Sequence, residues 1–177
     1  MASPQVQLLA ENLPEHRFLE AIFLEERRAG LVTVSSYLLP STALAAAELY
    51  LLQDRQRPIA LVLNSGTKVP EQIERKRASL QRVLSRITPE HWLVVLAIPD
   101  VDSWIMADPQ VQERMAADLA FRESRDERSA RIAELARTHP LDRNAIGQAH
   151  PEFRDLVGFI EQHTSVHTQT LSQNCEP

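Results

Sequence analysis

The sequence contains little cysteine and little glycine, and each shortage argues against a class of protein. The single cysteine, Cys175, cannot form a disulfide within the chain, which suits a reducing compartment. Only four glycines occur among 177 residues, and the chain has neither a Walker A motif nor a GxGxxG motif. Binding of a nucleotide by a glycine-rich phosphate loop is therefore not expected.

Long apolar segments are also missing. No apolar run approaches the roughly 20 residues that a membrane-spanning helix needs. The first residues, MASPQVQLLAENLPEH, lack the basic region and long apolar stretch of a secretory signal. We therefore expect a cytoplasmic protein with no membrane partner. The formal net charge of −5 gives no general attraction for nucleic acid, although a local basic groove would still bind phosphates.

What is present is a regular alternation of two kinds of segment. Short apolar stretches rich in β-branched residues predict strands, and longer stretches with apolar residues three and four apart predict helices. Strands that alternate with helices indicate parallel β-α units and an α/β fold. The predicted strands are 5–10, 31–39, 59–64 and 91–99. The predicted helices between them are 17–28, which Gly30 ends, 42–53, which Ser41 caps, and 71–87.

The strand pattern stops at about residue 109. The segment that follows is helical in composition, with charges of both signs three and four residues apart, and 151–162 is a short amphipathic helix. We expect a single domain over residues 1–162, with a sheet core at about 5–110 and a helical extension at about 111–162. Residues 163–177 are polar and predict a disordered tail.

Polar side chains follow three of the predicted strands. Glu11 follows the first, Asn64 ends the third, and Asp100 and Asp102 follow the fourth. Functional groups of a parallel sheet gather beyond the carboxyl ends of its strands. Carboxylate and amide oxygens are ligands that Mg²⁺ accepts in proteins. These four residues are therefore candidate ligands of a Mg²⁺ or Mn²⁺ ion.

Two segments carry a resemblance to a known family. AENLPEHRFLEAIF (10–23) and AIPDVDSWIMADP (97–109) resemble the first and last motifs of small bacterial TOPRIM-like proteins related to the overcoming-lysogenisation-defect nucleases. The resemblance implies a TOPRIM-like parallel four-stranded sheet flanked by helices. It also implies a bacterial setting of DNA repair, mobile elements or phage defence, with an ATPase or nuclease partner. In that family a glutamate and a D-x-D pair bind Mg²⁺ for phosphodiester cleavage.

The chain departs from this pattern where the metal would bind. The family's D-x-D pair falls on Asn64, Ser65 and Gly66, and Asn12 stands where a glycine usually follows the glutamate. Two missing carboxylates weaken the attraction for a divalent ion, and two-metal chemistry needs a dense cage of oxygens. We therefore predict a degenerate TOPRIM-like protein that acts as a binding or partner subunit without efficient catalysis.

Two other interpretations are compatible with the same residues. In the first, the chain is a weakly metal-dependent nuclease with Glu11 as general base. In the second, it is a structural or interaction protein whose acids only begin helices, with Asp102 as the cap of a helix near Ser103.

The helix expected at 71–87 carries a row of arginines. Arg75, Arg82 and Arg86 lie opposite its apolar face, where they could follow a nucleic-acid backbone or simply face water. In the segment after the last strand, Trp104 is expected in the core.

Overall fold

The computed structural model describes residues 5–117 and 125–173. Within them the chain forms one sheet of β1 (Val6–Ala10), β2 (Val32–Ser36), β3 (Ile59–Asn64) and β4 (Trp92–Ala97). The strand order is β2-β1-β3-β4, and all neighbours are parallel. The predicted α/β fold with a parallel four-stranded sheet is confirmed.

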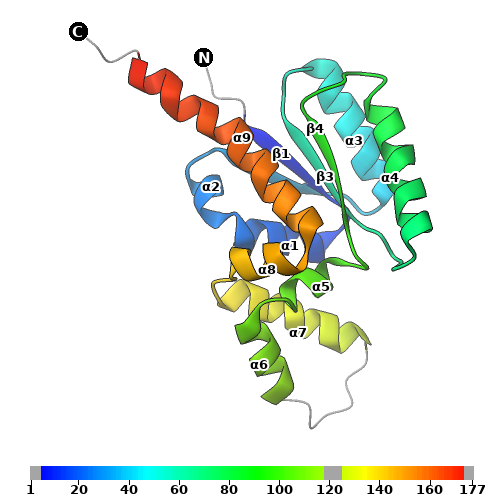
Figure 1. Ribbon diagram of the computed structural model, residues 1–177, viewed down its shortest axis with the longest axis vertical. Coiled ribbons are helices and arrows are strands. Elements are labelled where there is room, and N and C mark those ends of the chain that lie inside the picture. The colour runs from blue at the N-terminus through cyan, green and yellow to red at the C-terminus, as the bar shows by residue number, and fades with distance from the viewer. Residues whose placement is uncertain (1–4, 118–124, 174–177) are drawn as a thin grey trace.

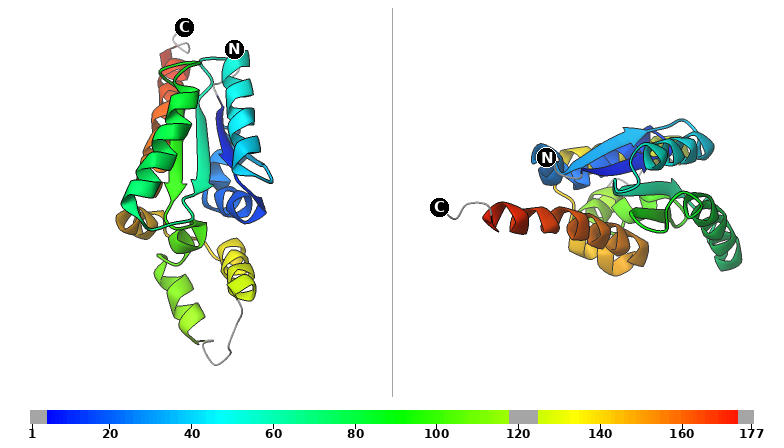
Figure 2. Two further views of the ribbon diagram at one scale, coloured as in Figure 1. Left: turned by 90° about the vertical axis from the view of Figure 1, so that its right-hand side faces the viewer. Right: turned by 90° about the horizontal axis from the view of Figure 1, so that it is seen from above.

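Helices cover both faces of this sheet and make up the C-terminal part, as predicted. Two of them, α3 and α4, lie on one face, and α9 runs along the other (Figures 1 and 2). Two others, α6 and α7, extend beyond the carboxyl ends of the strands (Figure 1). The helices are α1 (Leu13–Ile22), α2 (Leu24–Arg28), α3 (Pro40–Gln53), α4 (Pro70–Leu84), α5 (Val101–Ile105), α6 (Pro109–Ala117), α7 (Arg125–Thr138), α8 (Arg143–Ala149) and α9 (Pro151–Gln173).

The sheet separates two apolar cores. Side chains alternate between the faces of a strand, so Leu8 packs into one core and Leu9 into the other. The first core includes Phe18, Trp104 and Phe153, all at most 1% exposed. Burying one such side chain stabilises the fold by roughly 1.5–3 kcal/mol. The predicted core position of Trp104 is confirmed.

One predicted helix is divided in two. The segment 17–28 lies in α1 and α2, which meet at Phe23, whose φ of −109° and ψ of 33° are not helical. The ring of Phe23 is buried and stacks on Phe153 at 6.3 Å between centroids. Packing of this ring accounts for the break in the helix. Gly30 follows α2 with a φ of +72°, a left-handed conformation that glycine adopts without strain.

Two predicted boundaries are wrong. Ser41 is not the cap of α3, because the helix begins at Pro40 and its cap position is Leu39. Thr42 serves the turn instead: its hydroxyl accepts from the Leu39 N–H at 3.2 Å and donates to the Leu39 carbonyl at 2.7 Å. At the other end of the chain, α9 continues to Gln173, well past the predicted end at residue 162. Cys175 lies outside the described residues.

Candidate functional site

The strand order brings three of the predicted polar positions to one edge. Strands β1, β3 and β4 are direct neighbours, so their carboxyl ends lie side by side. Glu11 follows β1, Asn64 is the last residue of β3, and Asp100 comes shortly after β4. The pairing of Asn64 with Ala97 places the ends of β3 and β4 at the same level. These residues form the sheet-end site.

Asn64 is the centre of the sheet-end site. Its backbone N–H donates to Glu11 Oε2 at 2.9 Å, and its side-chain Nδ2 donates to Glu15 Oε1 at 2.5 Å. Its side-chain Oδ1 accepts from the Val101 N–H at 3.0 Å, and its backbone carbonyl accepts from Lys76 Nζ at 2.5 Å. One residue therefore ties the ends of two strands to α1, α4 and α5.

Glu15 is a site residue that the strand-end reasoning missed. It lies in the first turn of α1 and is only 4% exposed. Burial raises the pKa of its carboxyl above the ordinary value, and the nearby charges of Glu11 and Asp102 raise it further, against the lowering effect of the Asn64 hydrogen bond. In the described part of the chain its second oxygen, Oε2, is buried without a hydrogen-bond partner.

A signal for Glu15 does exist in the sequence. The buried face of α1 consists of residues three and four apart, and the glutamate occupies the first position of that series: Glu15, Phe18, Leu19 and Ile22. A carboxylate on the apolar stripe of an amphipathic helix must find a partner or lose its charge. The helical spacing could therefore have identified it as a candidate.

Lys76 is the second residue that sequence reasoning missed. It lies on α4, three residues after the buried Ile73, and is itself half-buried. Its ammonium bonds the Asn64 carbonyl, so it brings a fixed positive charge to the acidic end of the sheet.

The two predicted aspartates have different roles at the start of α5. Asp100, not Asp102, is the cap of α5: its side chain accepts from the Ser103 N–H at 3.2 Å. The expectation that Asp102 caps this helix is wrong, because α5 already begins at Val101 and Asp102 lies within its first turn. Asp102 is close enough to Glu15 to raise the pKa of that carboxyl.

The polar turn after β3 is held by hydrogen bonds within the turn and to Pro99. Gly66 has a φ of +72°, and its N–H donates to the Pro99 carbonyl at 2.9 Å. Ser65 donates its hydroxyl to the Thr67 carbonyl at 2.7 Å. An aspartate at Gly66 would have to adopt a left-handed conformation, which L-residues rarely adopt. The turn has the form of a structural loop.

Asn12 also has a conformational explanation. It stands where the TOPRIM-like pattern has a glycine, and here it is the cap position before α1. Its φ of −156° is extended, so this position does not require the left-handed freedom of glycine.

Two of the candidate ligand oxygens already accept hydrogen bonds. Asn64 Oδ1 and Asp100 Oδ1 both accept from backbone N–H groups. Among residues 5–117 and 125–173, no three His, Cys, Asp or Glu side chains lie where they could jointly hold a metal ion. The assignment of a metal to Glu11, Asn64, Asp100 and Asp102 stays a prediction. What the arrangement does chemically is join the partly buried carboxyl of Glu11 and the buried carboxyl of Glu15 to Asn64 and to the Lys76 ammonium.

The predicted nucleic-acid residues lie elsewhere on the surface. All three are exposed: Arg75 and Arg82 lie on α4, away from its buried residues Ile73 and Leu80, and Arg86 lies in the turn just after this helix. These three arginines are called the arginine face. Their exposure agrees with the solvated side of an amphipathic helix, and it agrees equally well with contacts to phosphates.

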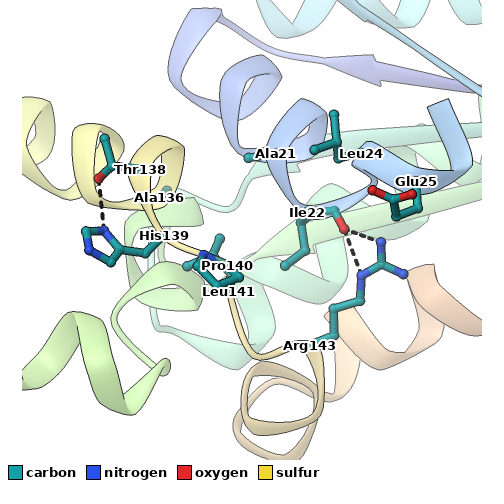
Figure 3. Close-up of a pocket in the computed structure, with 10 residues that line it drawn as sticks. All are labelled: Ala21, Ile22, Leu24, Glu25, Ala136, Thr138, His139, Pro140, Leu141 and Arg143. Carbon is teal, nitrogen blue, oxygen red and sulfur yellow. Dashed lines mark hydrogen bonds between the residues drawn. The ribbon is translucent and has the colours of Figure 1, made fainter. Parts of the chain in front are cut away.

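A separate hollow of about 380 Å³ lies between α1, α2 and the loop from α7 to α8 (Figure 3). Arg143 borders it, but its guanidinium donates to the Ile22 carbonyl and to both carboxylate oxygens of Glu26. His139 borders the other side, 2.9 Å from the Thr138 hydroxyl (Figure 3). The charge of Arg143 is already paired with Glu26, so this residue is not free to hold an anionic ligand.

Comparison of the chain with family models, with curated proteins and with solved structures finds no match. The fold and the site therefore define an α/β protein. It has a parallel four-stranded sheet and a hydrogen-bonded polar cluster at the carboxyl ends of the strands. In the part of the chain that the structure describes, every helix is too short or too polar to cross a membrane.

Proposed function

We propose that this chain is a degenerate TOPRIM-like protein of bacterial nucleic-acid metabolism or defence, acting as a binding or partner subunit without efficient catalysis. The observation that carries the proposal is the Asn64 side chain. Its amide nitrogen faces the Glu15 carboxyl, and its amide oxygen faces the Val101 N–H. At this position the family has an aspartate, which would place a second carboxylate against Glu15 and call for a cation between them.

The amide makes that cation unnecessary. An N–H₂ group donates directly to the Glu15 carboxyl, and Lys76 supplies a positive charge at the same strand end. Both are permanent parts of the chain, so this edge of the sheet is held together without a divalent ion. Such a site supports the proposal that the chain keeps a TOPRIM-like fold but no longer uses it for metal-dependent cleavage.

The proposal is tested by calorimetric titration of Mn²⁺ and Mg²⁺ into the wild type and Glu11→Ala, together with a plasmid cleavage assay. We expect no saturable binding below about 1 mM in either protein, and no metal-dependent cleavage above the control. Sub-millimolar binding that Glu11→Ala abolishes, with cleavage by the wild type, would instead establish the alternative of a metal-dependent nuclease.

Binding of nucleic acid is tested separately on the arginine face. We expect fluorescence anisotropy to detect salt-sensitive binding of a labelled DNA duplex that weakens in the triple variant Arg75→Glu, Arg82→Glu and Arg86→Glu. Arg28→Glu, at an exposed arginine of α2, is the matched control. Equal loss in both variants would remove this face from the proposal.

A second candidate function is supported by the surface of α3. Four leucines there or just before it are more than half exposed, namely Leu38, Leu39, Leu49 and Leu52. Such a set of apolar side chains is typical of a protein contact. It favours the interpretation of an interaction protein, in which the sheet-end acids serve only the fold.

A further inference from the structure

Strand β4 has a free outer edge, which polar and charged side chains of α4 and α9 border on its two sides. Strand β4 is the last strand of the sheet, and a hollow of about 320 Å³ lies against its Leu93–Val95 segment. Helices α4 and α9 stand on either side of β4 (Figure 1). Arg77 and Gln81 line the hollow from α4, and Glu152 and Asp155 line it from α9.

The register shows which backbone groups face this hollow. In β4, the carbonyls of His91 and Ala97 accept from β3, which directs the peptide groups of the odd-numbered residues inward. The N–H and carbonyl of Val94 therefore point out of the sheet. No hydrogen bond to either group occurs in the described part of the chain, although Val94 is only 5% exposed. Backbone groups that face such a hollow take their hydrogen bonds from solvent or from a bound chain.

A residue of an added strand would satisfy both groups. In an antiparallel pair, one residue exchanges both of its backbone hydrogen bonds with the residue opposite. Such strand addition at a sheet edge is a recurring mode of peptide recognition. The hollow at Val94 provides the space for it.

The walls specify the side chains of that strand. Val94 belongs to the core on the α4 side, whereas Leu93 packs on the α9 side. A partner residue opposite Val94 would point to the same face, toward Arg77, and its two neighbours would point toward Glu152 and Asp155. Of these two acids Asp155 is exposed, whereas Glu152 already accepts from Trp104 through Oε1. Arg77 forms an ion pair with the exposed Glu74 through Nη1, and within the described residues its other N–H groups remain as donors for a carboxylate.

We propose that the β4 edge binds an extended segment of a partner protein with a basic–acidic–basic pattern, the acidic residue lying opposite Val94. The segment adds to the sheet as a fifth strand through the Val94 N–H and carbonyl. Its basic side chains lie against Asp155 and Glu152, and its acidic side chain lies against Arg77. This inference does not depend on the sheet-end site, so it and the proposed function can fail independently.

The test uses synthetic peptides and the full-length protein. Fluorescein-labelled TVKEKVT carries the proposed pattern, and TVEKEVT inverts it. We expect saturable anisotropy binding of the first peptide below about 1 mM, and binding of the second at least about tenfold weaker. N-methylation of the central glutamate should abolish binding, whereas N-methylation of a flanking lysine, whose N–H points away from β4, should not.

Protein variants locate the binding to this edge. Asp155→Lys is expected to weaken TVKEKVT binding about tenfold, and Glu25→Lys on α2 is the matched control that should not. Val94→Pro removes the outward N–H together with the buried valine side chain, and should abolish binding; circular dichroism checks that the variant folds. Absence of saturable binding, equal binding of both peptides, or insensitivity to Asp155→Lys would overturn the proposal. A dimer in sedimentation analysis that Val94→Pro dissociates would also overturn it, by assigning the edge to a second copy.

Discussion

At the scale of single residues, Asn64 has the largest effect on the site. An asparagine has both a donor and an acceptor on one side chain, and here the donor faces Glu15 and the acceptor faces Val101. An aspartate would keep the acceptor and lose the donor. The amide nitrogen of Asn64 therefore lets this residue donate a hydrogen bond to Glu15, which an aspartate carboxylate could not do.

The buried carboxyl of Glu15 should make stability depend on pH. Its folded-state pKa is raised, mainly by burial, so the unfolded chain releases this proton first as the pH rises. The free energy of unfolding should fall as the pH rises above about 4.5, by at most about 1.4 kcal/mol per pH unit from this group. Glu15→Gln should match the wild type at low pH and lack this loss at higher pH.

The measurement is urea unfolding at several pH values between about 4 and 8. Glu25→Gln, at an exposed carboxyl, reports the effect of removing one acid from the surface. A pH dependence in Glu15→Gln as steep as that of the wild type would show that another group is responsible.

At the scale of elements, the start of α5 distinguishes a structural aspartate from a metal ligand. Asp100 accepts from the Ser103 N–H, which leaves one fewer unpaired donor in the first turn. Asp100→Ala should lower the free energy of unfolding by about 1 kcal/mol. Asp100→Asn should restore most of it, because asparagine caps helices as well as aspartate does.

Thermal unfolding of the two variants beside the wild type measures this difference. A metal ligand behaves otherwise: an asparagine would lose the charge that holds the ion, and both variants would be impaired alike in Mn²⁺ binding. Equal destabilisation by the two substitutions would rule out the capping role.

At the scale of the whole molecule, a few polar contacts join the C-terminal helices α8 and α9 to helices that lie far from them in the sequence. Arg143 of α8 forms a bidentate ion pair with Glu26 of α2, and its guanidinium lies 4.9 Å above the Phe23 ring. The hydrogen bonds from Arg143 lower the pKa of the Glu26 carboxyl. Trp104 Nε1 donates to Glu152 at 3.1 Å and ties α5 to α9.

Loss of the Arg143 contacts should destabilise the protein markedly more than loss of an exposed ion pair. We expect Arg143→Ala to cost about 2 kcal/mol, because the pair is partly buried and the Ile22 carbonyl also loses its donors. Arg28→Ala, which removes an exposed pair with Glu25, should cost less than about 0.5 kcal/mol. Urea unfolding at pH 7 compares the two variants.

The pH gives an independent check of the same pair. Since the pKa of Glu26 is lowered, its contribution is present above the ordinary value of 4.5 and is lost as the pH falls through the lowered pKa. The difference between the wild type and Arg143→Ala should therefore shrink in acid. A difference that stays constant down to low pH would assign the effect to packing on Phe23.

Much of the fold followed from local patterns. Four apolar segments became the four strands, because an apolar run buried on both faces is stable only inside a covered parallel sheet. The alternation with helices predicted the α/β class correctly, because parallel strands need crossover connections. The site was predicted less completely. Glu11 and Asn64 do come together, whereas Glu15 and Lys76 were missed because neither lies at a strand end.

The sequence by itself determined the elements and the edge at which polar groups gather, because both depend on residue spacing along a short segment. Only the tertiary structure decided which polar groups meet. The contact of Asn64 with Glu15 spans 49 positions and that of Arg143 with Glu26 spans 117. Such pairs depend on how helices pack across the sheet, and on which donors the packing leaves buried and in need of an acceptor.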